Sequence, residues 1–127
     1  MSENLQDPGH GQALVFQTAV TNVGNHYNHH NGVFTAPDQG VYVFTWTIVV
    51  TANGYIYTQI FVNSDVVGAM YTSDYGVDNA RTTTAIVVKH LDTMDVVSIR
   101  VNMHGALSGY IWSNEYHKSS FSGWKIF

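Results

Sequence analysis

The segment SGYIWSNEYHKSS, residues 108–120, combines side chains that suit a shallow sugar site. Aromatic faces stack on the C–H surfaces of sugars, while amide, carboxylate and imidazole groups bond to hydroxyls. Tyr110 and Trp112 share one face of an expected strand, so they are either ligand contacts or aromatics of the core or of a subunit seam. The residues past this strand are the better surface candidates: Asn114, Glu115, Tyr116 and His117.

A second polar stretch carries His26, His29 and His30. Imidazoles three and four positions apart suit a zinc site on a helix, but this stretch has the composition of a loop, and neither Cys nor Asp lies beside it. The pattern is typical of a solvent-exposed loop. A pH-sensitive loop is the alternative, because histidine titrates near neutrality.

Motifs for catalysis are missing from the sequence. It has no nucleophile elbow and no Gly-rich phosphate loop. Paired carboxylates beside a plausible cleft cannot be identified either. The sequence therefore predicts a protein that is not an enzyme.

The amino-acid composition excludes several other classes of protein. The 127 residues fit one domain, with 45 % apolar and only 11 % charged residues and a net charge of -4. The five Lys and Arg residues are scattered, which disfavours nucleic-acid binding. No apolar run is long enough to span a membrane, and the polar start shows no signal peptide. Cysteine is absent, so disulfides and thiolate metal sites are excluded.

Period-two alternation runs through most of the chain, and it predicts an antiparallel sandwich or barrel. Residues 1–12 are polar and are expected to form a flexible arm. Turn signals such as Asn31-Gly32, Pro37-Asp38 and Asn53-Gly54 separate short segments rich in β-branched and aromatic residues. The expected strands cover residues 13–20, 32–36, 41–50, 55–62, 66–71, 83–91, 96–103, 108–113 and 121–127.

Two of these strands are apolar on both faces. In residues 41–50, one face carries Tyr42, Phe44, Trp46, Ile48 and Val50, and the other carries Val41, Val43 and Val49. Residues 55–62 behave similarly. Since a sandwich buries only one face of a strand in its own core, the pattern predicts a homo-oligomer whose copies cover the second face. The alternative is a central strand that simply carries extra valine.

The aromatic spacing of the first half resembles the signature of the complement C1q globular-head domain. Its anchors are Phe16, Asn22, Tyr27, Phe34, Gly40, Tyr42, Phe44 and Trp46, with Trp46 in place of the usual Phe or Tyr. The closing FSGWKIF (121–127) and LDTMDVVSIRV (91–101) are also similar to this family, although Met94 stands where Gly is usual. The similarity covers residues 13–127.

The resemblance implies a ten-stranded antiparallel jelly-roll sandwich of the kind shared with tumour necrosis factor, packed as a homotrimer. The family's first strand is expected to be missing or poorly ordered here, because only a polar arm precedes Leu14. Family members are mostly secreted recognition modules. Without a collagen-like stalk, the chain looks like the soluble, innate-immune lectins of bivalve molluscs, which bind carbohydrates or microbial surface molecules. The alternative is a cytokine-like module that binds a receptor or another protein.

The resemblance also directs attention to TSDYGVDNAR, residues 72–81, the most polar loop. In the family, aspartates of this region contribute to ligand contact and help to hold calcium, which takes six to eight hard oxygens. The matching residues are Asp74, Tyr75 and Asp78, with Asp74 and Asp78 as the calcium candidates, and Arg81 of the same loop is a further candidate for ligand binding. The alternative is an ordinary hairpin loop with solvated carboxylates.

Overall fold

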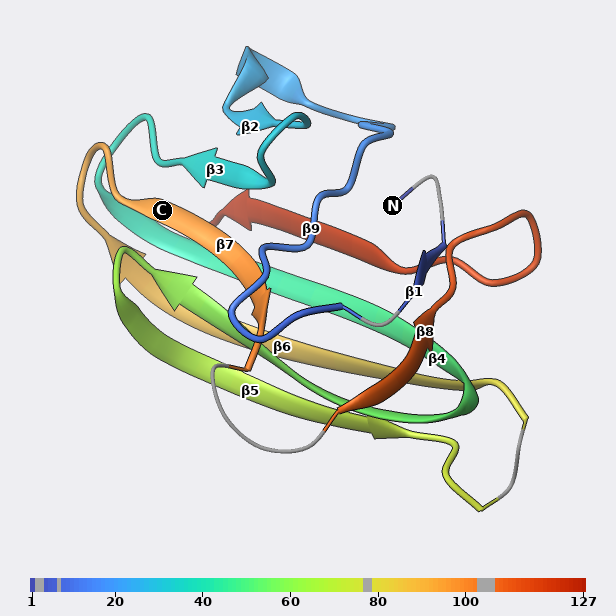
Figure 1. Ribbon diagram of the computed structural model, residues 1–127. Coiled ribbons are helices and arrows are strands. Elements are labelled where there is room, and N and C mark those ends of the chain that lie inside the picture. The colour runs from blue at the N-terminus through green and yellow to red at the C-terminus, as the bar shows by residue number, and fades with distance from the viewer. Residues whose placement is uncertain (2–3, 7, 77–78, 103–106) are drawn as a thin grey trace.

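The computed structural model describes residues 1, 4–6, 8–76, 79–102 and 107–127. Within these residues the chain forms nine strands and one short 3-10 helix, η1 (Val23–Asn25). The strands are β1 (Leu5–Gln6), β2 (Tyr27–Asn28), β3 (Val33–Thr35), β4 (Gly40–Val62), β5 (Asp65–Ser73), β6 (Arg81–Leu91), β7 (Val96–Val101), β8 (Ser108–Ile111) and β9 (Ser120–Lys125) (Figure 1). Every strand pairing is antiparallel, as the sequence predicts.

Strand β4 belongs to both layers of the fold. Residues 40–50 pair with β6 and, over part of their length, with β9. Residues 55–62 pair with β5 and β7, and β7 is extended by β3 and then β2. Between these segments Ala52 and Asn53 have φ values of 62° and 55°, which makes a tight corner. One 23-residue strand thus supplies the two strands that the sequence predicts at 41–50 and 55–62.

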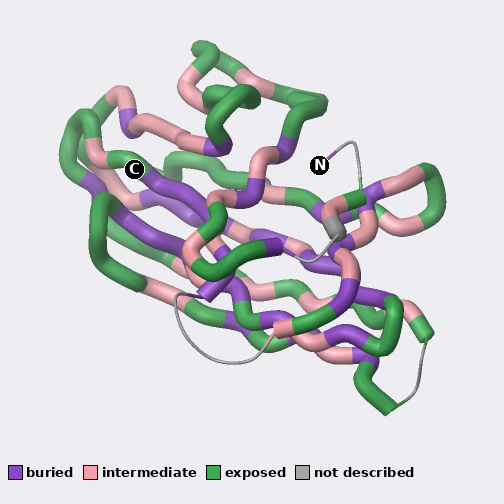
Figure 2. Tube along the Cα trace, in the orientation of Figure 1, coloured by how far each residue is buried: buried purple, intermediate pink, exposed green. Residues whose placement is uncertain are grey.

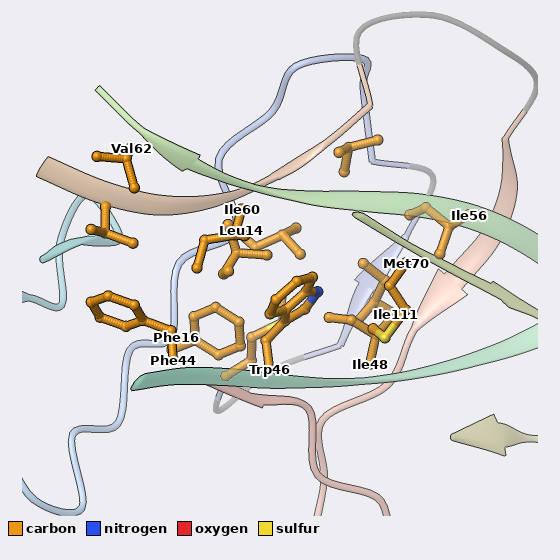
Figure 3. Packing of buried hydrophobic residues seen from close by; sticks show 14 of the residues in the cluster. Leu14, Phe16, Phe44, Trp46, Ile48, Ile56, Ile60, Val62, Met70 and Ile111 are labelled. Carbon is orange, nitrogen blue, oxygen red and sulfur yellow. The ribbon is translucent and has the colours of Figure 1, made fainter. Parts of the chain in front are cut away.

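The core lies between these two segments of β4. Figure 3 shows Phe44, Trp46 and Ile48 of the first segment directed towards Ile56 and Ile60 of the second. Each of these side chains is at most 1 % exposed. Buried residues follow the middle of the strands, whereas exposed residues dominate the loops (Figure 2). The predicted core face of residues 42–50 is therefore confirmed.

A hydrogen bond joins the two layers inside this core. The indole Nε1 of Trp46 donates to Oγ1 of Thr58 at 3.0 Å, and both side chains are buried. The bond satisfies an indole N–H that would otherwise have no partner away from water, which is a costly condition.

The aromatic anchors of the signature pack against one another. The ring centroids of Phe34 and Phe44 lie 5.5 Å apart in an edge-on arrangement. Phe121 of β9 contacts Phe16 and Tyr27, with centroid distances of 5.8 Å and 6.0 Å. Aromatic pairs of this kind stabilise a core by about 0.5–1.5 kcal/mol each beyond the burial of their area. The signature is therefore a structural frame.

Asn22 and Gly40 have the structural roles that the sequence suggests. Asn22 Nδ2 donates to the carbonyl of Tyr27 at 2.8 Å, and its Oδ1 accepts from the N–H of Tyr27 at 3.2 Å. The Tyr27 hydroxyl accepts from the N–H of Phe16, and burial raises the pKa of Tyr27. At Gly40, a Cβ atom would collide with the carbonyl oxygen of Phe127.

The prediction of a strand over residues 13–20 is wrong. Only Ala13 forms a bridge, an isolated one with Arg100. The chain then leaves the sheet, and Val20 is 92 % exposed. The segment has the β propensity of a strand but no neighbouring strand continues alongside it, and propensity yields to tertiary context.

The N-terminal segment makes more contacts than a loose arm would. Leu5 of β1 pairs with Ile111 of β8. The Met1 side chain is buried, and the N–H of Gly11 donates to the carbonyl of Val101 at 3.0 Å. A first strand is therefore present, contrary to the expectation, while the boundary placed at residue 12 stays a prediction.

Candidate functional site

The two polar loops singled out in the sequence lie at the same end of the sheets. Val50 of β4 pairs with Arg81, where the first loop ends, and with Ile111, just before the second begins. Figure 1 shows both loops, between β5 and β6 and between β8 and β9, on the side opposite the β6–β7 turn. The pairings of β4 with β6 and with β8 therefore bring together residues that the sequence separates by about thirty positions.

The carboxylate of Asp74 is buried, which corrects the alternative of a solvated hairpin carboxylate. Its exposed fraction is 1 %. Oδ1 accepts from the N–H of Gly54 at 2.5 Å, and the N–H of Asp74 donates to the carbonyl of Gly54 at 3.0 Å. Oδ2 has no hydrogen-bond partner among the described residues. Asp74 thus fastens the β5–β6 loop to the corner of β4.

Other residues of this loop are exposed and rest on the same corner. The Tyr75 ring is 65 % exposed and meets Tyr55 edge-on, with centroids 5.6 Å apart. The N–H of Gly76 donates to Oδ1 of Asn53 at 2.6 Å. Arg81 is exposed, and Asp78 lies outside the described residues. Tyr75 and Arg81 are therefore accessible to a ligand, whereas Asp74 is not.

The β8–β9 loop is held by Asn114. Its Oδ1 accepts from the N–H groups of Tyr116 and His117 at 2.9 Å and 3.0 Å, and its own N–H donates to the carbonyl of His117 at 2.7 Å. The His117 ring packs on Trp112, with centroids 4.9 Å apart. Glu115 and Tyr116 project into solvent. Asn114 and His117 therefore shape the turn, whereas Glu115 and Tyr116 are free to contact a ligand.

A close approach of backbones fixes the two loops relative to each other. Gly109 of β8 has a φ of 88°, and a Cβ there would lie 2.6 Å from both the Cα of Gly54 and the carbonyl oxygen of Thr51. Only glycine fits this crossing. Nothing in the sequence pattern marks Gly109, because the constraint comes from another part of the chain.

The described residues of one subunit do not form a metal centre. No group of three or more His, Cys, Asp or Glu side chains gathers in the described part of the chain. His29 and His30 stack at 4.0 Å, but nothing joins them to a third ligand there. Oδ1 of Asp74 is engaged by the N–H of Gly54, and Oδ2 is buried without a partner among the described residues. Calcium binding at Asp74 and Asp78 stays a prediction.

On the predicted second face of β4, Val43 and Val49 are already buried within one subunit, so the exposed apolar side chains of this face lie on the flanking strands β9 and β6. Val43 pairs with Val88 on one side and with Trp124 on the other, and Ile86 is the next outward residue of β6. Trp124, Ile86 and Val88 are 54 %, 66 % and 59 % exposed. The alternation of apolar and polar residues in 83–91 and 121–127 indicates that these strands have an outward apolar face. It does not indicate that they are the strands that flank β4.

Comparisons with known proteins identify a domain family that matches the whole fold. A profile of the C1q domain matches residues 1–126. Caprin-2 from Danio rerio is 30 % identical over 117 residues, which make up 91 % of this chain and 12 % of that protein. The chain thus spans a small part of the length of this curated relative.

Two solved structures have the same fold. The globular domain of the zebrafish complement 1qA protein superposes with a TM-score of 0.73 at 16 % identity, covering 98 % of this chain and 96 % of that one. Eiger TNF from S. frugiperda gives a TM-score of 0.69 at 14 % identity, covering 98 % of this chain and 84 % of that one. The predicted jelly roll of the C1q and TNF type is confirmed.

Proposed function

The chain belongs to the C1q domain family, and from this premise we propose that it is a homotrimeric recognition module that binds glycans or microbial surface molecules. Domains of this family are typically trimeric modules of protein binding and recognition, and they are usually extracellular. The C1q and TNF families are non-enzymatic, in agreement with the prediction from the sequence. In the described residues, no helix has the length and apolar character to cross a membrane.

One observation carries the proposal of self-association: the exposed apolar surface formed by Trp124, Ile86 and Val88 on the strands that flank the buried Val43. A tryptophan more than half exposed beside an exposed isoleucine is unusual for a sheet face that stays in water. Charged side chains are scarce in the chain, at 11 % of residues, so little else shields this face. Copies of the same chain can cover this apolar surface in a closed symmetric assembly.

Recognition of glycans is assigned to the loops at the end near Val50. Glu115 and Tyr116 of one loop and Tyr75 and Arg81 of the other are exposed there. Tyrosine rings offer faces for sugar C–H groups, and the charged groups offer hydrogen bonds to hydroxyls. A single shallow site binds weakly, but three copies on one axis raise the avidity for a repetitive surface. Such a module resembles the secreted lectins of bivalve innate immunity.

An aromatic pair favours a second candidate, a module that binds a protein partner. Tyr57 of β4 and Tyr71 of β5 pair directly, and their ring centroids lie 4.4 Å apart. Both rings are exposed, at 44 % and 48 %, and Val66 near the other end of β5 is exposed as well. Tyrosine is enriched at protein interfaces. The likeness to Eiger TNF fits this reading.

A glycan array separates the two candidates. We expect saturable binding that free sugar competes away, and loss of this binding in the Glu115→Ala/Tyr116→Ala variant, which leaves the turn bonds of Asn114 intact. Val66→Ala is the control, because it removes an exposed apolar side chain at the end of β5 away from the loops. A blank array for the intact trimer contradicts glycan recognition. If Tyr71→Ala instead abolishes binding to a purified protein ligand, the second candidate holds.

A further inference from the structure

A cavity of about 430 Å³ lies at the end of the molecule opposite the two loops. It is formed by the β2–β3 hairpin on one side and the β6–β7 turn on the other. Its volume falls within the range of small-molecule sites. The hairpin and the turn are joined by backbone bonds, from Ala36 to the carbonyl of Asp95 and from Met94 to the carbonyl of Ala36, both at 2.8 Å. The cavity therefore has a fixed frame.

Three asparagines around this cavity are oriented by the backbone. Asn28 Oδ1 accepts from the N–H of His30 at 2.8 Å, and Asn31 Oδ1 accepts from the N–H of Val33 at 3.0 Å. Asn25 Oδ1 accepts from Nδ2 of Asn22 at 3.2 Å. In each case the acceptor oxygen is engaged, and the Nδ2 group has no hydrogen-bond partner among the described residues. The three side chains are exposed, and they line the cavity with amides whose orientation is fixed through Oδ1.

An imidazole joins these donors because of a glycine. The His26 ring lines the cavity and lies so close to Gly24 that a Cβ on Gly24 would collide with it. Gly24 has a φ of 77°, which also favours glycine. The carbonyl of His26 accepts from the N–H of Thr35 at 2.9 Å, so the backbone of His26 is held as well.

The rest of the cavity wall is apolar and uncharged. Ala36 is fully buried, and Val33 and Pro37 are half-buried. Met94 stands over them with 69 % of its surface exposed. Its φ of 73° is a conformation that costs a side chain like methionine energy, and such strain concentrates at binding sites. No Asp, Glu, Lys or Arg lines the cavity.

From this combination we infer that the cavity binds an N-acetylated hexosamine. An acetamido carbonyl accepts hydrogen bonds from the asparagine Nδ2 groups, and its methyl group packs on Met94 and Pro37. Sugar hydroxyls donate to the His26 ring and to Thr35. The absence of charged lining residues favours a neutral ligand over an ionic one. This site is separate from the loops near Val50 and does not depend on their role.

The test is a titration of the protein with N-acetylglucosamine and with glucose, followed by the amide NMR signals of the cavity residues. We expect saturable shifts at the side-chain amides of Asn28 and Asn31 with N-acetylglucosamine and at least severalfold weaker binding of glucose. No saturable shift at these groups, or equal binding of the two sugars, overturns the inference.

Two variants sharpen this test. Asn28→Asp/Asn31→Asp keeps both Oδ1 acceptors, and thus the turn, but removes both Nδ2 donors. We therefore expect the affinity for N-acetylglucosamine to fall by about tenfold or more. Asn53→Asp is the matched control, because its Oδ1 also holds a backbone N–H, that of Gly76, outside the cavity. Unchanged binding in the double variant overturns the inference, as does equal weakening in the control.

A third variant addresses the acetyl group. Met94→Gly places glycine where the backbone has a positive φ, so folding is retained, but it removes the wall that packs on the methyl group. We expect the preference for N-acetylglucosamine over glucose to fall towards one. A preference that is unchanged in this folded variant contradicts the assigned pose.

Discussion

The buried Oδ1 of Asp74 accepts a hydrogen bond from the N–H of Gly54, twenty residues earlier in the chain, at 2.5 Å. This bond ties the β5–β6 loop to the corner where β4 passes from one layer to the other. The bond positions the start of the loop next to the accessible Tyr75, whereas Arg81 is positioned by its pairing with Val50.

Removing the Asp74 carboxylate should therefore destabilise the domain. We expect Asp74→Ala to lower the free energy of unfolding by about 1–3 kcal/mol, because the Gly54 N–H loses its buried partner. Asp74→Asn should cost less, since an amide oxygen can still accept this bond. Urea unfolding of the two variants checks the order, and an Asn variant as unstable as the Ala variant contradicts the proposed role of Oδ1.

The hydrogen bond between Trp46 and Thr58 should contribute measurably to stability. Thr58→Val keeps the shape of the side chain but leaves the buried indole N–H unpaired, at a cost of about 1–3 kcal/mol. Thr47→Val is the control, because Thr47 Oγ1 pairs with Thr84 Oγ1 at the surface, where water can replace the partner. If the two variants lower the melting temperature equally, the buried hydrogen bond contributes no more to stability than the surface one.

Two glycines with positive φ should respond differently to alanine. Gly109→Ala brings a Cβ within 2.6 Å of the Gly54 Cα, so we expect severe destabilisation or loss of folded protein. Gly76→Ala meets no atom within 4 Å and should cost only about 1 kcal/mol for the unfavourable backbone conformation. Denaturant unfolding compares them, and a well-tolerated Gly109→Ala is the contrary result.

Charges on the apolar sheet face should prevent self-association. We expect Ile86→Lys and Trp124→Glu to shift the protein from trimer to a folded monomer, because a charge in this interface would be desolvated without a partner. Val66→Lys, at a 48 % exposed position of β5 on the other layer, is the control and should leave the trimer intact. Sedimentation at micromolar protein measures both, and a folded wild-type monomer contradicts the assembly.

The Asp95 carboxylate should make part of the stability dependent on acid pH. The Asn63 side chain, and then the Asp92 N–H, hydrogen-bond to it and lower the pKa of Asp95 from the usual 3.8. Its contribution is therefore complete above pH 3.8 and is lost as the pH falls through the lower folded-state value. We expect the free energy of unfolding of the Asp95→Asn variant to depend less on pH in this acid range. An NMR titration of Asp95 at or above its usual pKa contradicts the prediction.

The aromatic frame could be predicted from the sequence because its cause is local. Successive side chains of a strand point to opposite faces, so the residues from Tyr42 to Trp46 indicate their own core face without reference to the rest of the chain. The same period indicated a second apolar face on β4. Residues 13–20 have a similar composition, but their pairing depends on a neighbour that the sequence does not reveal.

The amino-acid sequence by itself determined the strand faces, the turn residues and the family. Only the tertiary structure decided that Asp74 is buried, that Gly109 crosses Gly54, and that Met94 and Asn28 line the same cavity. These relationships join segments twenty to more than sixty positions apart, and they follow from the register of paired strands. Local residue patterns do not encode that register, because it is fixed by the packing of the whole core.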